Sequence, residues 1–180
     1  MTGDSRISLK GFVTANLVVR HWEEWLEEAE KRKALEARLA EILTPSVLAH
    51  LPPSMQLSGA ASSVRGWVSA RAAESRVFVV ATAGEGEIVG LLILVQLPET
   101  AQKDALHLGY LLAESAWGRG YATELVTGLV NAKGFGTGTR FSGGVGKENI
   151  ASAKVLQKSG FTRSAALSSD DTDQFIFTVL

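Results

Sequence analysis

The sequence contains no cysteine among its 180 residues. This absence excludes disulfides, thiolate metal sites and cysteine nucleophiles together. Long apolar runs are missing as well: the longest, residues 88–95, is far shorter than the roughly 20 residues that a membrane span needs. No charged-then-apolar segment opens the chain. We therefore expect a cytoplasmic protein without a membrane partner.

A large charge of one sign is also lacking, because the formal net charge is −1. The charges are nevertheless uneven: residues 115–163 hold seven Lys or Arg against two Glu, whereas residues 164–180 hold only acidic charges. This excess suits a small polyanionic ligand and is too small for a nucleic-acid-binding face. With 46% hydrophobic residues, the chain can form the core of a single domain, residues 1–180.

The most informative segment is an apolar stretch, residues 106–112, followed by the turn Trp-Gly-Arg-Gly-Tyr-Ala at 117–122 and a helical pattern. The first N–H groups of a helix have no partner inside it, and glycine lets the backbone approach a phosphate closely. A strand, a Gly-x-Gly turn and a helix in this order therefore indicate pyrophosphate binding. On its own, a Gly-x-Gly turn is weak evidence for pyrophosphate binding.

A second motif, Asn-Ile-Ala-Ser-Ala-Lys-Val-Leu-Gln-Lys-Ser-Gly-Phe, occupies residues 149–161. Asn149 is a favoured helix N-cap and Ser152 lies three residues later in the first turn, so capping alone would explain both residues. Gly160 is placed to end the helix.

Together, Gly-Tyr-Leu-Leu at 109–112, residues 117–124 and residues 149–161 resemble the GNAT superfamily of N-acetyltransferases. They are most similar to its RimJ/RimL-type branch of ribosomal-protein N-terminal-alanine acetyltransferases, because the wider superfamily usually has Gln or Arg where Trp117 stands. The resemblance is strong over 105–163 and faint before residue 75. It implies an α/β (α+β) GNAT fold, with a mixed, mostly antiparallel central sheet of about seven strands flanked by helices.

The resemblance also implies acetyl-CoA as the acyl donor. Main-chain groups of Leu111 and Leu112 would pair with its pantetheine arm, Asn149 would bond the same arm, and Ser152 would protonate the departing thiolate. The pyrophosphate would be held by the turn and the start of the helix, namely Trp117, Gly118, Arg119, Gly120, Tyr121, Ala122 and the hydroxyl of Thr123.

The acid and the base are less clear from the residues. Many superfamily members use a tyrosine from about this last helix as the acid, but Tyr110 and Tyr121 both lie earlier and are explicable as packing residues, so Ser152 or solvent is expected instead. An attacking amine must also lose a proton. His107 is the first candidate, because it lies on the strand beside the acyl group and titrates in the useful range. The alternatives are Glu114, Asp170, Asp171 and Asp173.

The remaining pattern predicts a charged helical stretch over 17–43 with a bend or break near 31–33, where the apolar stripe changes face. Thr44 and Pro45 should begin a short helix. His21 and His50 lie in this weakly matching region and are expected to be structural. Strands are predicted over 7–13, 76–82, 88–97, 106–112, 140–145, 161–167 and 174–180, with helices over 60–73, over 121–132 and from 149.

These observations predict transfer of an acetyl group to a primary amine by direct attack in a ternary complex, without a metal. The acceptor is expected to be a protein or peptide N-terminus. A small-molecule amine, such as a polyamine or an antibiotic, is the alternative that the acidic residues 170–173 would suit. A non-catalytic acyl-CoA-binding domain is a third reading, and the chain is compatible with a monomer or a homodimer.

Overall fold

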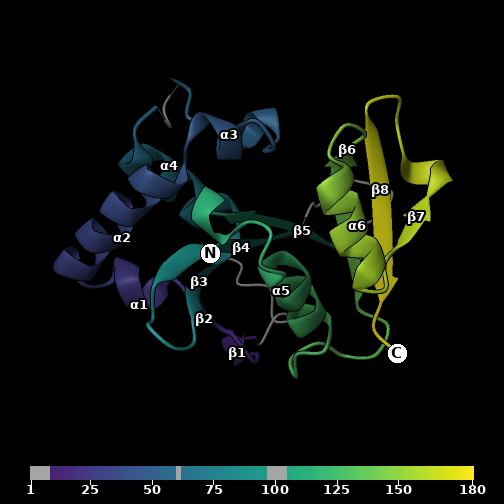
Figure 1. Ribbon diagram of the computed structural model, residues 1–180, viewed down its shortest axis with the longest axis horizontal. Helices are drawn as coiled ribbons and strands as arrows, with labels where there is room; N and C mark the ends of the chain where they lie inside the picture. The colour runs from purple at the N-terminus through teal and green to yellow at the C-terminus, as the bar shows by residue number, and fades with distance from the viewer. Residues whose placement is uncertain (1–8, 60–61, 97–104) are drawn as a thin grey trace.

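The computed structural model describes residues 9–59, 62–96 and 105–180. Its strands form one mixed sheet in the order β1-β2-β3-β4-β5-β6-β8-β7 (Figure 1). Every neighbouring pair is antiparallel except β5 with β6. The mostly antiparallel sheet is confirmed, with eight strands in place of about seven. The strands are β1 Gly11–Val13, β2 Leu17–His21, β3 Arg76–Thr82, β4 Ile88–Gln96, β5 Ala105–Leu112, β6 Arg140–Gly146, β7 Thr162–Ser164 and β8 Thr172–Thr178.

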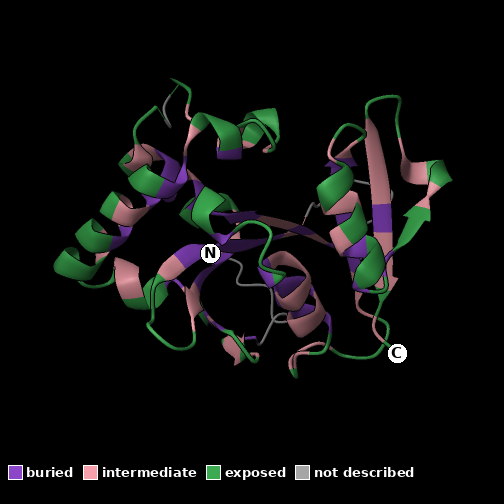
Figure 2. Cartoon of the chain, viewed as in Figure 1, coloured by how far each residue is buried: buried purple, intermediate pink, exposed green. Residues whose placement is uncertain are grey.

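Helices cover both faces of the sheet, because the central strands bury side chains on both faces (Figure 2). In β3, Phe78 and Val80 pack with α5 and α6, whereas Val77 and Val79 pack with α2, α3 and α4. The helices are α1 Glu23–Leu26, α2 Ala29–Ile42, α3 Pro45–Leu48, α4 Val64–Glu74, α5 Tyr121–Val130 and α6 Ile150–Lys158, and short 3-10 turns are η1 Pro53–Met55, η3 Glu114–Ala116 and η4 Ala165–Leu167.

The prediction of helix from residue 17 is wrong. Leu17–His21 forms strand β2, which pairs with β1 and β3 and buries Leu17 and Val19 in the core. The interruption of the following helix is also earlier than predicted: Glu28 is extended, with φ −107° and ψ 123°, and separates α1 from α2. The residues after β2 have a helical composition, and the prediction extended that helix back to residue 17. The pairing of β2 with a strand on each edge decides its conformation instead.

Several other predictions hold. Thr44 caps α3, accepting a hydrogen bond from the Val47 N–H at 3.4 Å. Strand β3 has the predicted bounds, and β6 and α5 differ from them by one or two residues. The predicted strand over 161–167 is reduced to β7 and the turn η4, while β8 begins two residues early. Residues 7–8, 60–61 and 97 of predicted elements lie outside the described residues.

Strands β5 and β6 pair only at their beginnings, through Ala105 with Arg140, Leu106 with Phe141 and His107 with Ser142. Beyond this point β5 continues beside β4 as far as Leu112, and β6 continues beside β8 as far as Gly146. The two strands therefore diverge, and their facing backbone edges are left without ladder partners in the sheet. This opening positions the site.

Two further observations concern the described part of the chain. None of its helices combines the length and apolar character that crossing a bilayer requires. Within residues 9–59, 62–96 and 105–180, no group of three or more His, Cys, Asp or Glu side chains is arranged to hold a metal ion.

Candidate functional site

A cavity of about 690 Å³, called here the main cavity, opens where β5 and β6 diverge. Nearly all the predicted cofactor residues line it: Leu111, Leu112, Trp117, Gly118, Gly120, Tyr121, Ala122, Thr123, Asn149 and Ser152. Arg119 is the exception, since its guanidinium carbon lies 5.0 Å from the centre of the Tyr121 ring and the residue does not line the cavity. Two motifs about thirty residues apart in the sequence thus meet at one site.

The turn before α5 has a backbone conformation that requires glycine. Gly118 has φ +72° and Gly120 has φ +80°, and a Cβ on either would meet no atom within 4 Å. The first helical bond is donated by Glu124 N–H to Gly120 O at 3.0 Å, so the N–H groups of residues 121–123 precede the helix ladder. These amides and the open space above the glycines fit an anion.

Trp117 contributes differently from its prediction. Its own N–H donates to Glu114 O at 3.1 Å, so the amides offered to an anion begin at Gly118. Its indole Nε1 donates to Leu112 O at 2.9 Å and thereby ties the turn to the end of β5. The turn is held in place against the strand that borders the opening.

On the opposite wall, Asn149 caps α6: its Oδ1 accepts from the Ser152 N–H at 3.1 Å. The Ser152 hydroxyl in turn accepts a hydrogen bond from the Tyr110 hydroxyl at 3.1 Å. Tyr110 was expected to be a packing residue. It also lines the main cavity and is hydrogen-bonded to Ser152, the predicted acid. No local spacing reveals this contact, because the two residues are 42 positions apart.

His107 lies elsewhere. Strand alternation places it on the face of Leu111, which packs with α2 and α4, and Tyr110 on the opposite face. It is the last residue of β5 that pairs with β6, and it does not line the main cavity. Its Nε2 is buried without a hydrogen-bond partner among the described residues. Burial lowers the pKa of His107, so the ring is neutral at physiological pH.

The alternative bases are bonded to other side chains or lie outside the main cavity. Glu114 accepts a hydrogen bond from the Thr44 hydroxyl. Asp173 forms an ion pair with Arg163 at 2.7 Å, and the hydrogen bond from that guanidinium lowers the pKa of the Asp173 carboxyl. Neither these carboxylates nor Asp170 and Asp171 line the main cavity. The structure gives none of them a direct route to a group bound there.

Sequence reasoning missed a wall formed by α3 and the residues that follow it. Val47, His50 and Leu51 line the main cavity, and the His50 ring lies edge-on to that of Trp117 at 6.1 Å. His50 was expected to be structural, yet it borders the site. Because it comes from the weakly matching region of the chain, neither motif pointed to it.

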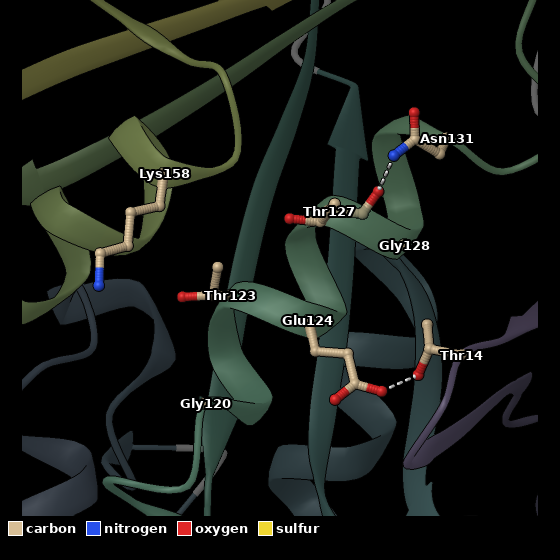
Figure 3. Close-up of a pocket in the computed structure, with 8 residues that line it drawn as sticks. All are labelled: Thr14, Gly120, Thr123, Glu124, Thr127, Gly128, Asn131 and Lys158. Carbon is tan, nitrogen blue, oxygen red and sulfur yellow. Dashed lines mark hydrogen bonds between the residues drawn. The ribbon is translucent and has the colours of Figure 1, made fainter.

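A second, shallower hollow of about 550 Å³ adjoins the main cavity and shares Gly120, Thr123 and Lys158 with it. In Figure 3, Lys158 extends from α6 on one side of α5, and Thr14 lies beside Glu124 on the other. The site therefore continues outward along α5, with a cation at the junction. Of the two lysines of α6, Lys158 lines the site and Lys154 does not.

The geometry fits a long ligand with an anionic middle and an extended polar arm. The amides from Gly118 onward suit a pyrophosphate, and the unpaired edges of β5 and β6 suit an arm that bonds like a strand. The hydroxyls of Ser152 and Tyr110 lie on the wall of the same cavity. Coenzyme A has this chemistry.

Comparison with known protein families agrees with a coenzyme A site. The profile of the family described as acetyltransferase (GNAT) domain matches residues 17–162. No protein with a curated functional description matches the sequence.

Solved structures share the fold. RimL, the ribosomal L7/L12 alpha-N-protein acetyltransferase in complex with coenzyme A, is 16% identical with a TM-score of 0.65, over 93% of this chain and 96% of that one. A GNAT acetyltransferase from Bacillus anthracis is 17% identical with a TM-score of 0.64, over 94% and 98%. Spermidine N-acetyltransferase from Vibrio cholerae, with CoA and spermine, is 13% identical with a TM-score of 0.64, over 92% and 97%.

At these identities the solved structures show the fold alone, whereas the family profile covers most of the chain. The chain belongs to the GNAT acetyltransferase family and is an acetyl-CoA-dependent N-acetyltransferase.

Proposed function

We propose that this enzyme acetylates the primary amine of a protein or peptide N-terminus by direct attack in a ternary complex. The observation that supports the transfer is the opening between β5 and β6, which is bordered by the glycine turn and by Ser152. The choice of acceptor rests on the pairing of Asp173 in the final acidic loop. Direct attack suits the composition, because the chain has no cysteine to hold an acyl group.

The cofactor is bound mainly by backbone groups. The amides of residues 118–123 hold the pyrophosphate, and the main chain at Leu111 and Leu112 pairs with the pantetheine arm. The side-chain oxygen of Asn149 is already used as a helix cap, so its NH₂ group is the donor that remains for the arm. When bound, acetyl-CoA supplies the activated acetyl group, and these residues orient it.

His107 is proposed to accept the proton of the attacking amine, directly or through water. It stands where the strands begin to diverge, on the sheet face opposite Tyr110 and Ser152. Burial lowers the pKa of His107, so the ring is neutral at physiological pH, and Nε2 has no hydrogen-bond partner among the described residues. Because Nε2 is buried and His107 lies outside the main cavity, the proton would reach it through water at the opening between β5 and β6.

The state of the final acidic loop favours a peptide N-terminus over a polyamine. A polyamine site needs several free carboxylates, but Asp173 is paired with Arg163. The positive charge of Lys147 also lowers the pKa of the Asp173 carboxyl. RimL and a ribosomal-protein-S5-alanine acetyltransferase from Vibrio fischeri share the fold. The spermidine enzyme shares it as well. The exposed Asp170 and Asp171 support a small-molecule amine as the second candidate.

A thiol-release assay separates these acceptors. Because the enzyme has no cysteine, a thiol reagent detects only the CoA that is set free. Four acceptors are compared at equal concentration: lysine-free and cysteine-free peptides that begin with Ala or Ser, the same peptides with an acetylated N-terminus, N-acetylated peptides with one internal lysine, and spermidine.

We expect turnover with the free N-terminal peptides and none with their blocked counterparts. Turnover with spermidine alone would favour the small-molecule alternative. Binding of acetyl-CoA without thiol release from any acceptor in the panel would contradict the proposed acceptor class.

A further inference from the structure

Tyr110 and Ser152 form a hydroxyl pair that bridges a strand and a helix across the wall of the main cavity. The Tyr110 hydroxyl donates to Ser152 Oγ at 3.1 Å, and both residues line the cavity. Because Ser152 Oγ receives this bond, its own hydrogen is free to point elsewhere. A proton can therefore pass from Tyr110 through Ser152 towards the cavity.

Both members are fixed in position. Tyr110 packs among the core residues on the α5 and α6 face of the sheet. The Ser152 backbone is held by the Asn149 cap. One helical turn later, Leu156 is buried and lies so close to Gly143 that a Cβ there would be 3.0 Å from its methyl group. This contact sets α6 closely over β6, just beyond the point where the strands part.

Tyr110 is also a more suitable proton source than serine alone. A serine hydroxyl that gave up its proton would become a strongly basic alkoxide, whereas a phenol has a pKa near that of a thiol. Burial raises the pKa of Tyr110, and the hydrogen bond with Ser152 opposes this only in part. The phenol is therefore protonated at neutral pH.

We infer that Tyr110 and Ser152 form a two-hydroxyl proton relay to the sulfur of CoA, with Tyr110 as the proton source. The inference rests on the proposed function. As the amine nitrogen bonds to the acetyl carbon and the carbon–sulfur bond breaks, Ser152 Oγ gives its proton to the sulfur. Tyr110 Oη then replaces that proton on Ser152. The amine loses one proton to its base and solvent returns one to Tyr110, so the cycle balances.

Two single variants and their combination test the relay. Tyr110→Phe removes only the phenolic hydroxyl, and Ser152→Ala removes the hydroxyl proposed to protonate the sulfur. We expect either change to lower kcat by about 10²-fold, with the KM for acetyl-CoA unchanged within about twofold. The double variant should be no slower than Ser152→Ala, because Ser152→Ala alone already stops proton transfer through the pair.

Ser159→Ala is the matched control. Thr127 Oγ1 of α5 donates to Ser159 Oγ at 3.2 Å, so this is another hydroxyl pair, formed at the C-cap of α6. Ser159 lines neither hollow. Its loss should leave kcat unchanged, which separates loss of the relay from a general loosening of α6.

A measurement on bound CoA tests the relay without any acceptor. The ultraviolet absorbance of the thiolate gives the pKa of the CoA thiol in its complex with the enzyme. The other ionisable side chains that line the cavity are His50, Tyr121, Glu148 and Lys158, and all are present in every variant. If the relay donates to the sulfur, the thiol pKa should be higher in Tyr110→Phe and Ser152→Ala than in the wild type and in Ser159→Ala.

The outcomes separate the relay from the proposed function. A Tyr110→Phe enzyme with wild-type kcat and an unchanged thiol pKa would overturn the relay, as would losses that multiply in the double variant. A wild-type protein that binds CoA but acetylates no amine would contradict the proposed function, and the thiol titration would still decide whether the relay exists.

Discussion

Gly118 and Gly120 hold the phosphate turn in a left-handed conformation that other residues reach at a cost of about 1–2 kcal/mol. Gly120→Ala should therefore destabilise the fold by about that amount and weaken acetyl-CoA binding at least about tenfold, which is about 1.4 kcal/mol. Its measurement is isothermal calorimetry of the folded variant. Gly86→Ala is the control, because Gly86 has φ +69° and open space around it in the turn between β3 and β4.

The control should lose similar stability and keep full affinity for acetyl-CoA. Equal losses of affinity in both variants would mean that backbone strain, and not the turn itself, explains the weaker binding.

His107 allows a second test at the residue scale. Burial lowers its pKa below the ordinary value of 6.5, so the neutral form that accepts a proton persists into mildly acidic solution. We expect kcat/KM to fall only as the pH drops through a value below 6.5, and His107→Gln to abolish this limb and reduce kcat by about 10²-fold. The measurement is a pH profile of thiol release. An unchanged acid limb in the variant would exclude His107 as the base.

The sequence predicted the cavity residues well and their mutual arrangement poorly. The glycine turn and the Asn149 cap are local features, so spacing alone was enough. Strand alternation could also have shown that His107 and Tyr110, three positions apart, face opposite sides. The bond between Tyr110 and Ser152 could not be predicted, because it depends on how far apart β5 and β6 diverge.

At the scale of elements, Glu124 joins the first turn of α5 to the turn between β1 and β2. Its carboxylate accepts from Thr14 Oγ1 at 2.5 Å, from Asn16 N–H at 2.7 Å and from Asn16 Nδ2 at 2.9 Å. Desolvation would raise the pKa of Glu124, but these hydrogen bonds outweigh it and lower the pKa below 4.5. Ionised Glu124 therefore stabilises the folded state.

Glu124→Gln should lower the free energy of unfolding by about 1 kcal/mol at pH 7, since a neutral amide cannot accept all three bonds and the site is partly solvated. A lowered pKa in the folded state means that this stabilisation is complete above about pH 4.5 and is lost as the pH falls through the folded pKa. Urea unfolding at pH 7 and pH 3 measures it. A difference of the same size at both pH values would contradict the role of charge, and Glu85→Gln, in the exposed β3–β4 turn, is the control.

The error over residues 17–21 has a physical cause at this scale. Two adjacent valines, Val18 and Val19, favour a strand, but the Trp- and Glu-rich segment after them is helical and dominated the pattern. The pairing of β2 with both β1 and β3 decides the outcome. Strands with two partners in the sheet are stabilised by contacts that a local window does not contain.

For the whole molecule, the arrangement of helices on both faces explains why a site forms at the opening. The α5 and α6 face supplies the phosphate turn, Tyr110 and Ser152, whereas the α2 and α4 face holds His107. The two sheet faces beside the opening therefore carry the proposed acid and the proposed base separately. Single-domain organisation remains a prediction from length and composition.

Thermal unfolding with and without acetyl-CoA is the most direct test of the central claim. At about one hundred times its dissociation constant, acetyl-CoA should stabilise the fold by about 2.7 kcal/mol and raise the Tm by about 5–10 °C. ATP and NAD should give a much smaller shift, and Gly120→Ala should reduce the shift with acetyl-CoA. No shift with acetyl-CoA in the folded protein, or an equal shift with ATP and NAD, would contradict the assignment of the glycine turn and the cavity to coenzyme A.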